Sequence, residues 1–582
     1  MNVAEAVGAA LAALGVRAAF GVVGSGNFHV TNALVEHGVR YVAARHEGGA
    51  ATMADAYARM SGTVAVLTVH QGPGLTNALT GVTEAAKSRT PLLVLAPEVT
   101  SPTSNFRIDQ TALAEAVGAH CARVGSAATV VDDTVMAFLA ALLGRRTVVL
   151  NLPLDVQAET LPDEAAEAVR ELLAGRGGAH RDVASRVPAA WGLTFPIESG
   201  DDEEPEGLTA EPSDELTRFA RMLAEAERPV FVAGRGARGA RRELEALGER
   251  VGALFATSAV AKGHFHGSPW DLDVSGGFAT PLAAELIRGA DLVVGWGCSF
   301  TMWTTRHGAL IGPETRVVQV DLDPDALGVH REIGLGVVGD VRETARAVAA
   351  LLGEPGAGGD TGTRGYRAPE IAERIAREGR WRDVPYEDLS AEGRIDPRTL
   401  TIGLDDLLPQ ERLVAVDSGN FMGYPSMFLT VPDGGAFCFT QAYQSIGLGL
   451  ATAIGAAVAR PDRLAVAALG DGGALMGVAE LETVVRLGLP MVVVVYDDDG
   501  YGAEVHHFGP HGFPLGAVTF PPADIAGIAR GFGFEAVTVR REEDLSGVAE
   551  WLKGPRDKPL LVHAKVTADR PSWWLEEAFR GH

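Results

Sequence analysis

Residues 470–502 read GDGGALMGVAELETVVRLGLPMVVVVYDDDGYG, and they decide the fold class of this chain. The apolar run before them, 464–469, predicts a buried strand that ends at a glycine loop. A helical pattern follows as far as Leu487, and the apolar run 491–496 predicts the next strand. Two strands joined by a helix run parallel and end on the same side of their sheet. The sequence therefore predicts an α/β fold with a ligand-binding crevice at the carboxyl edge of a parallel sheet.

Two acids at the ends of these predicted strands indicate a metal site. Asp471 and Asp498 are expected to face the same crevice. Carboxylate oxygens suit Mg²⁺, which keeps few protein ligands and completes its octahedron with phosphate oxygens and water. The glycines at 472 and 473 let backbone N–H groups and the helix start approach a diphosphate closely. The alternative is an ordinary strand-to-helix turn, because short motifs often match by chance.

Length and composition describe a globular protein of several domains. A chain of 582 residues is too long for one core. Its formal charge of −25 argues against a nucleic-acid partner, because the phosphates would be repelled. Three scattered cysteines argue against a disulfide framework or a zinc site and indicate a reducing cytoplasm. We expect neither a signal peptide nor a membrane span, since no basic segment precedes the apolar amino terminus and no apolar run is long enough.

Changes of pattern along the chain predict three α/β domains. In the first domain, buried parallel strands are predicted at 18–23, 63–70, 91–96 and 146–152. An acidic run, ESGDDEEPE at 198–206, marks a linker. The predicted boundaries are 1–165 for the first domain, 166–215 for the acidic linker, 216–352 for a central domain, 353–395 for a second linker and 396–582 for the third domain with its tail.

Residues 470–502 resemble the diphosphate-binding motif of thiamine-diphosphate enzymes, which opens with Gly-Asp-Gly and closes with Asn or a neighbouring acid. The resemblance covers nearly the whole chain. It implies three doubly wound parallel-sheet domains, namely a pyrimidine-binding, a central Rossmann-like and a diphosphate-binding domain. It also implies thiamine diphosphate and Mg²⁺ as cofactors, with the metal held by Asp471, Asp498 and the carbonyl of Gly500. The implied cofactor contacts in this motif are Gly470, Asp471, Gly472, Gly473, Asp498, Gly500, Tyr501 and Gly502.

The chain departs from the family's motif at one position. Asp497 stands where the family usually has Asn, so a third acid lies next to the predicted diphosphate site. We expect it either to weaken cofactor binding or to point away into solvent.

The first domain carries a candidate catalytic acid in the segment RHEGGAATMADAYARMSG. Glu47 opens a predicted helix of small residues, and by position alone it is an acid that complements the helix dipole. The segment also looks like the Arg-His-Glu helix of acetolactate synthase-like enzymes, which implies that Glu47 meets the aminopyrimidine ring of the cofactor. A carboxylic group on that ring nitrogen favours the imino tautomer, which removes the thiazolium proton, and a pocket of low polarity helps.

Further segments match the family less specifically. HQGPGLTN, from His70, looks like the family's Gly-Pro-Gly-x-x-Asn turn, and His70 is the second candidate catalytic residue, with a core or surface histidine as the alternative. The resemblance places Ile446 as an apolar wedge under the bent cofactor, although an isoleucine beside glycines is usually core. The candidate cofactor contacts outside the motif are Gly24, Gly74, Asn77, Ser418, Gly419, Asn420, Gln444 and Ile446.

The resemblance also bears on assembly and on FAD. Glu47 lies in the first domain, whereas Asp471 and Asp498 lie in the third. In the family two subunits bring such residues together, which implies a homodimer or homotetramer with active sites at the subunit interface. FAD is considered because of GRGARG at 234–239 and VDLDP at 320–324, but it is not favoured, since a glycine-rich turn is weak evidence.

We therefore expect a cytoplasmic enzyme that decarboxylates a small-molecule 2-oxo acid and transfers the acyl carbanion equivalent to an acceptor. The alternatives are a simple non-oxidative decarboxylase and a catalytically silent regulatory homologue. Retention of Glu47 together with Asp471 and Asp498 argues against a catalytically silent homologue. The segment NFR at 105–107 replaces the Phe-Gln-Glu of acetolactate synthases, so the substrate stays open. The carboxyl-terminal PSWWLEEAF is either a lid or the anchor of a packed tail.

Overall fold

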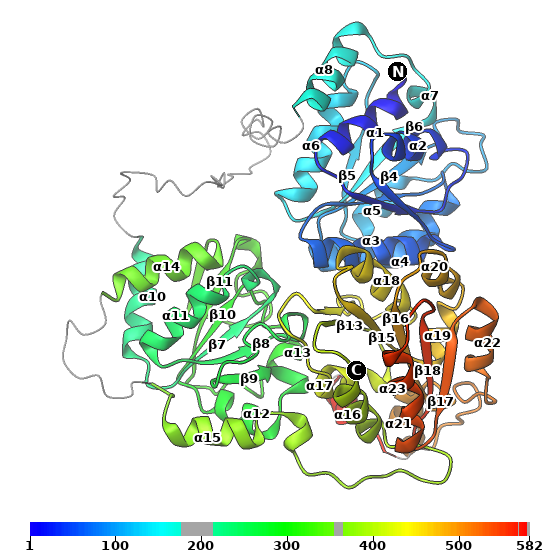
Figure 1. The fold of residues 1–582 in the computed structure, drawn as a ribbon. Coiled ribbons are helices and arrows are strands. Elements are labelled where there is room, and N and C mark those ends of the chain that lie inside the picture. The colour runs from blue at the N-terminus through cyan, green and yellow to red at the C-terminus, as the bar shows by residue number, and fades with distance from the viewer. Residues whose placement is uncertain (176–212, 354–364, 569, 579–582) are drawn as a thin grey trace.

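Three parallel sheets, each with helices on its faces, form the protein (Figure 1). The computed structural model describes residues 1–175, 213–353, 365–568 and 570–578. Each sheet in these residues has six strands, and all pairings between the strands are parallel. This confirms the predicted α/β class with three parallel-sheet domains.

The first and third sheets share one strand order. The first sheet, in the order β2-β1-β3-β4-β6-β5, consists of β1 (Ala18–Gly21), β2 (Arg40–Ala43), β3 (Ala65–Thr68), β4 (Leu92–Glu98), β5 (His120–Arg123) and β6 (Thr147–Pro153). The third sheet, in the order β14-β13-β15-β16-β18-β17, consists of β13 (Arg412–Val416), β14 (Phe437–Phe439), β15 (Leu464–Gly470), β16 (Met491–Asp497), β17 (Glu535–Val539) and β18 (Leu560–Lys565). Numbered within each domain, both orders are 2-1-3-4-6-5, so the two domains have the same topology.

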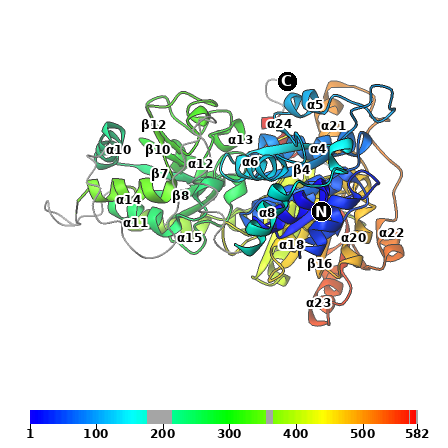
Figure 2. The ribbon, with the colours of Figure 1, turned by 90° about the horizontal axis from the view of Figure 1, so that it is seen from above.

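The central sheet has a different order. It consists of β7 (Pro229–Ala233), β8 (Leu254–Thr257), β9 (Asp271–Val274), β10 (Leu292–Trp296), β11 (Arg316–Asp321) and β12 (Leu335–Val338). From the β9 edge the order is β9-β8-β7-β10-β11-β12, the 3-2-1-4-5-6 order of doubly wound nucleotide-binding sheets. Seen from above, this domain lies beside the other two (Figure 2).

Helices fill the space between strands and cover the sheets. Those of the first domain are α1 (Val3–Ala13), α2 (Phe28–Glu36), α3 (Glu47–Ser61), α4 (Pro73–Lys87), α5 (Gln110–Ala116), α6 (Val130–Leu142), α7 (Leu154–Gln157) and α8 (Asp163–Ala174). Those of the central domain are α10 (Asp214–Glu225), α11 (Arg241–Val251), α12 (Pro281–Arg288), α13 (Met302–Thr305), α14 (Val341–Leu351) and α15 (Pro369–Glu378). Those of the third domain are α16 (Pro397–Leu407), α17 (Gly423–Phe428), α18 (Gly449–Ala459), α19 (Asp471–Met476), α20 (Glu480–Arg486), α21 (Gly502–Phe508), α22 (Ile525–Phe532), α23 (Ser546–Lys553) and α24 (Trp573–Ala578).

Helices α3 and α18 join the first domain to the third (Figure 1). Both are rich in alanine and glycine, so their backbones approach closely. A Cβ added at Gly455 in α18 would lie 2.1 Å from the carbonyl oxygen of Met53 in α3. Buried residues of the two helices belong to one hydrophobic cluster that extends into both sheets. Because this shared core cannot be opened without exposing apolar surface, the two domains form one packed unit.

The domain boundaries stay predictions, although helices lie in both segments expected to be linkers. Helix α8 continues to Ala174 and buries Val169 against the first domain, and α15 buries Ile375 against the central domain. The acidic run 198–206 lies outside the described residues. None of the helices in the described parts of the chain is both long and apolar enough to cross a membrane.

Candidate active site

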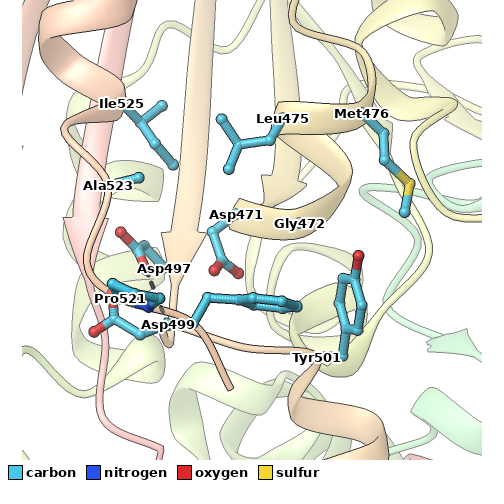
Figure 3. Close-up of a pocket in the computed structure, with 11 residues that line it drawn as sticks. Asp471, Gly472, Leu475, Met476, Asp497, Asp499, Tyr501, Pro521, Ala523 and Ile525 are labelled. Carbon is cyan, nitrogen blue, oxygen red and sulfur yellow. Dashed lines mark hydrogen bonds between the residues drawn. The ribbon is translucent and has the colours of Figure 1, made fainter. Parts of the chain in front are cut away.

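A cavity of about 310 Å³ opens beyond the carboxyl ends of β15 and β16, at the edge where the sequence predicts a crevice (Figure 3). Its lining includes Asp471, Gly472, Met476, Tyr501 and Phe520. All of its lining residues come from the third domain. Figure 3 shows the Asp471 carboxylate and the Tyr501 ring on opposite sides of Gly472.

Two carboxylates at this edge lie close enough for the charge of one to raise the pKa of the other. Asp471 is the first residue of α19 and is 8% exposed, and its burial together with the nearby charges of Asp498 and Asp497 raises its pKa to about 8. Burial likewise raises the pKa of Asp498 to about 6, against a hydrogen bond from Asn420. Buried like charges repel each other, and a divalent cation between them would relieve that repulsion. The pair therefore fits the two side-chain ligands predicted for Mg²⁺.

The remaining ligands of such a cation would come from elsewhere. Among the described residues, no three His, Cys, Asp or Glu side chains converge as a complete metal site. A backbone carbonyl, phosphate oxygens and water would have to complete the octahedron, which is the usual coordination of Mg²⁺.

Glycines keep the cavity floor open to a ligand. A Cβ at Gly472 would lie 2.6 Å from the Tyr501 ring, and one at Gly473 would lie 2.4 Å from a carboxylate oxygen of Asp417. A Cβ at Gly502 would lie 2.2 Å from Asp498. Side chains at these positions would displace the groups that form the site, and Gly472 itself lines the cavity. The backbone N–H groups of a helix start such as that of α19 suit a diphosphate.

Asp417, which sequence reasoning missed, fixes the loop that carries Ile446. Its buried carboxylate accepts hydrogen bonds from the backbone N–H groups of Ser418 (2.8 Å), Gly447 (3.0 Å) and Leu448 (3.2 Å). Burial nevertheless raises its pKa to about 7. Ile446 itself is half-buried beside Gly447, so its role as a wedge remains a prediction.

The other predicted contacts of the third domain lie around this loop and the metal acids. Gly419 has a φ of +138°, which favours glycine, and it precedes Asn420 at the start of a short 3₁₀ helix. Gln444 is exposed, with a φ of +60°. Gly500 pairs with Thr519 in an isolated antiparallel bridge.

Asp497 does not point into solvent, which excludes one of the two expected outcomes, and the other, weaker cofactor binding, stays a prediction. It is 1% exposed and contacts two basic side chains of β18, with 2.7 Å to Lys565 Nζ and 2.5 Å to His563 Nε2. Burial opposes its charge, but these hydrogen bonds prevail and lower its pKa to about 2. The third acid of the motif is therefore neutralised from the strand behind it.

In the first domain, Glu47 and Asn77 meet at the carboxyl edge of the sheet. Glu47 begins α3, and its Oε2 accepts a hydrogen bond of 3.1 Å from Asn77 Nδ2. Asn77 lies in α4, which begins at Pro73 after the glycine turn. The two helices thus bring together residues that the sequence assigns to the cofactor.

His70 lies in a second group at the same edge. The Gly26 N–H donates to His70 Nδ1 (3.4 Å), so a neutral ring carries its proton on Nε2. A Cβ at Gly24 would lie 2.4 Å from the same nitrogen, and one at Gly74 would lie 3.2 Å from His70 Cβ. Phe106 packs edge-on against the ring. The imidazole is held by backbone that only glycine allows to come so close.

Glu47 does not line the cavity that contains Asp471. Instead, Glu480, a buried residue of the third domain, holds the segment that precedes Glu47. Its Oε1 accepts hydrogen bonds from the backbone N–H groups of Arg45 (3.0 Å) and His46 (3.1 Å). The first domain provides a matching contact, in which Glu84 accepts from the N–H groups of residues 442 and 443. Each domain thus fixes a loop of the other that carries predicted cofactor contacts.

We expect Glu480→Ala to lower the free energy of unfolding by about 1–3 kcal/mol, because two backbone donors lose a buried acceptor. Urea unfolding followed by circular dichroism measures this. Glu482→Ala is the matched control, since Glu482 is a partly exposed partner of Arg45 and should cost no more than about 1 kcal/mol. Equal losses in the two variants would contradict a special role for Glu480.

The carboxyl-terminal segment is an anchor. Trp574 is 1% exposed and packs against Gly423, where a Cβ would lie 2.5 Å from the indole ring. Its Nε1–H and the Ser572 hydroxyl both donate to the carbonyl of Asn420. The tail therefore supports the segment whose Asn420 side chain contacts Asp498.

The glycine-rich loop of the central domain is used for packing. A Cβ at Gly234 would lie 2.0 Å from the carbonyl oxygen of Gly297, so the loops after β7 and β10 touch directly. Arg235 and Arg238 donate to backbone carbonyls of Ser88 and Arg59 in the first domain. These groups hold the central domain against the first domain, and the expectation that FAD is possible but not favoured stays a prediction.

Comparisons with known proteins agree with this architecture. Sequence models described as the N-terminal TPP binding domain, the central domain and the C-terminal TPP binding domain of thiamine pyrophosphate enzymes match residues 1–118, 216–348 and 417–564. The sulfoacetaldehyde acetyltransferase of Castellaniella defragrans is 28% identical over 571 residues, which cover 94% of this chain and 89% of that protein. The acetolactate synthase isozyme 2 large subunit of Escherichia coli K12 is 26% identical over 592 residues, covering 99% and 97%.

A solved structure has the same fold. The thiamine diphosphate-dependent 4-hydroxybenzoylformate decarboxylase of Rhodococcus jostii RHA1 superposes with a TM-score of 0.75 at 22% sequence identity. The match covers 97% of this chain and 99% of that chain. The arrangement of all three domains is therefore shared.

Proposed function

The chain belongs to the thiamine pyrophosphate enzymes, and from this premise we propose that it decarboxylates a 2-oxo acid and transfers the acyl carbanion equivalent to an acceptor, with Mg²⁺ as the metal. The observation that carries the proposal is a pair of neighbouring carboxylates, the buried Asp471 and the half-buried Asp498, where Asp471 and Gly472 line the cavity and the charge of Asp498 raises the pKa of Asp471. Relatives named as an acetyltransferase and as an acetolactate synthase support transfer over simple decarboxylation.

Residues of the chain have distinct tasks in this proposal. Asp471, Asp498 and the Gly500 carbonyl would hold Mg²⁺, and the backbone of residues 470–473 would bind the diphosphate. When bound, thiamine diphosphate would supply a deprotonated thiazolium carbon as nucleophile toward the 2-oxo acid and an electron sink for the bond broken as CO₂ leaves. Glu47 shares a proton with the pyrimidine ring, and Asn77 orients its carboxylate. His70 presents its Nε2–H to the substrate side, where it can donate a hydrogen bond.

The proposal includes two copies of the chain. Glu47 does not line the cavity that Asp471 lines, which supports the arrangement that the resemblance implies, in which a partner's first domain supplies the acid to this cavity. Exposed apolar side chains support a covered surface here, because Met476 is 56% and Phe520 42% exposed at the cavity. On the first domain Phe106, beside His70, is 44% exposed. We expect a homodimer as the smallest active unit, either alone or paired into a tetramer.

The test of function is a substrate panel. Purified protein is incubated with thiamine diphosphate, Mg²⁺ and a set of 2-oxo acids, each with and without aldehyde or 2-oxo acid acceptors, and with phosphate as a further acceptor. Release of CO₂ and the products are followed by mass spectrometry. Carboligation products support the proposal, CO₂ with free aldehyde alone favours the simple decarboxylase, and no turnover of any acid contradicts both.

Removal of the metal should release the cofactor. We expect EDTA treatment followed by desalting to abolish turnover and to release most of the bound thiamine diphosphate. Without the metal, the carboxylates of Asp471 and Asp498 would repel the diphosphate. Bound cofactor is measured by fluorescence after oxidation to thiochrome. Mg²⁺ should restore both, whereas NaCl at equal ionic strength should not. Retention of the cofactor after metal removal would contradict the metal assignment.

A further inference from the structure

The segment that follows β16 is held from behind by two cationic side chains. Lys565 Nζ donates to Asp497 Oδ2 and to Asp499 Oδ1, each at 2.7 Å. Arg394 forms an ion pair with Asp499 and donates to the carbonyl of Val566 (2.8 Å). The strand register places Lys565 directly opposite Asp497, so the first pairing is built into the sheet.

These contacts fix an unusual backbone conformation. Asp499 has a φ of +59°, which residues other than glycine seldom adopt, although Asp tolerates it better than most. The Asp499 N–H donates to Asp497 Oδ1 (3.0 Å), which closes the turn. The turn lies around Asp498, so its shape decides where the Asp498 carboxylate and the Gly500 carbonyl point.

The same contacts balance charge. Four acids lie at this edge, namely Asp471, Asp497, Asp498 and Asp499. Lys565 and Arg394 compensate Asp497 and Asp499, whereas no ion pair within the described residues involves Asp471 or Asp498. The uncompensated charge is therefore that of two carboxylates, which matches a divalent cation. Without Lys565, Asp497 would keep its contact with His563 (2.5 Å) but lose its lysine ion pair, and a buried carboxylate without a fixed cation beside it is costly.

We propose that Lys565 is a positioning residue of the metal–diphosphate site, where it neutralises Asp497 and holds residues 497–500 in the shape that binds the cation. This inference rests on the proposed function. It explains how the chain accommodates an acid at a position where the resembling family usually has Asn.

A double-variant cycle tests the proposal. Apo protein is titrated with thiamine diphosphate at saturating Mg²⁺, with tryptophan fluorescence as the readout, and urea unfolding of each apo variant is recorded. We expect Lys565→Met to weaken cofactor affinity by about 30-fold or more, as when one partner of a buried charge pair is removed. Lys565→Met combined with Asp497→Asn should return affinity to within about threefold of the wild type, because the unpaired charge is gone. Lys558→Met is the control and should change nothing, because Lys558 is exposed and lies outside β18, before its first residue.

Each outcome decides the matter. If Lys565 had a purely structural role, Asp497→Asn could not restore the cofactor affinity lost in Lys565→Met, because it restores no side-chain volume. A double variant that binds the cofactor as weakly as Lys565→Met therefore overturns the proposal. Unchanged affinity in Lys565→Met overturns it too. If Lys565→Met is insoluble, a soluble double variant with near wild-type affinity supports the proposal, and an insoluble double variant contradicts it. If the wild type itself binds no thiamine diphosphate with Mg²⁺, the proposed function fails, which is distinguishable from a failure confined to Lys565.

Discussion

Glu47→Gln is expected to bind thiamine diphosphate with affinity close to the wild type but to turn over at least about 100-fold more slowly, the usual contribution of a positioned acid or base. The glutamine keeps the shape of the side chain and its contact with Asn77 but cannot share a proton with the pyrimidine ring. Turnover is measured with the 2-oxo acid that the panel selects, and affinity by fluorescence titration.

A direct readout separates this effect from misfolding. Exchange of the proton at the thiazolium carbon for deuterium, followed by NMR on the bound cofactor, should slow along with turnover. Glu36→Gln, at the end of the preceding helix α2, is an exposed control and should leave both unchanged. Normal turnover in Glu47→Gln would remove this acid from the mechanism.

Asp471→Ala is expected to act on binding. Mutation of a residue that only hydrogen-bonds to a metal ligand typically lowers metal affinity by roughly 10- to 100-fold. Loss of a predicted ligand itself should therefore weaken Mg²⁺-dependent cofactor binding by at least about 100-fold. The site would keep Asp498 alone, and the start of α19 would lose its acid. Titration of the apo protein with cofactor at several Mg²⁺ concentrations measures the effect. Normal cofactor binding that no longer responds to Mg²⁺ would contradict the assignment of Asp471 as a ligand of Mg²⁺.

Mixing the two inactive variants tests the shared site. If Glu47 of one subunit serves Asp471 of the other, a heterodimer of Glu47→Gln and Asp471→Ala has one intact site and one doubly defective site. Random exchange of subunits should then restore about a quarter of wild-type activity. A site built within one chain predicts no recovery, provided that mass spectrometry of the intact dimers confirms the exchange.

The long apolar strands of this protein were predictable, whereas its short edge strands were not. Strands such as β4 and β16 are buried on both faces, so they appear in the sequence as continuous apolar runs. β2 and β5 contain polar and partly exposed residues at the edges of the first sheet, and β5 was missed. The helical pattern after Asp471 divides into α19 and α20, a break that periodicity did not reveal.

Asp471, Asp498 and the glycines around them lie in one short stretch of sequence, next to two apolar runs that predict strands. Their position at one edge of the sheet was therefore predictable. The supporting residues were not, because their partners are distant in sequence. Lys565 lies 68 residues after Asp497, and Glu480 lies 435 residues after Arg45. Only the register of β16 on β18 and the packing of α20 against the first domain bring these groups together.

The reciprocal contacts of Glu84 and Glu480 have a consequence for the origin of the molecule. α3 and α18 occupy equivalent places, since each follows the second strand of a sheet with the order 2-1-3-4-6-5. Each of the two glutamates lies on a helix after the third strand of its own sheet and reaches across to the loop that precedes the other domain's helix. This is the geometry that duplication and fusion of one self-pairing ancestral gene would leave, with the symmetry axis now inside a single polypeptide. In the proposed function, one half of such a fusion activates the coenzyme's ring and the other retains its charged tail.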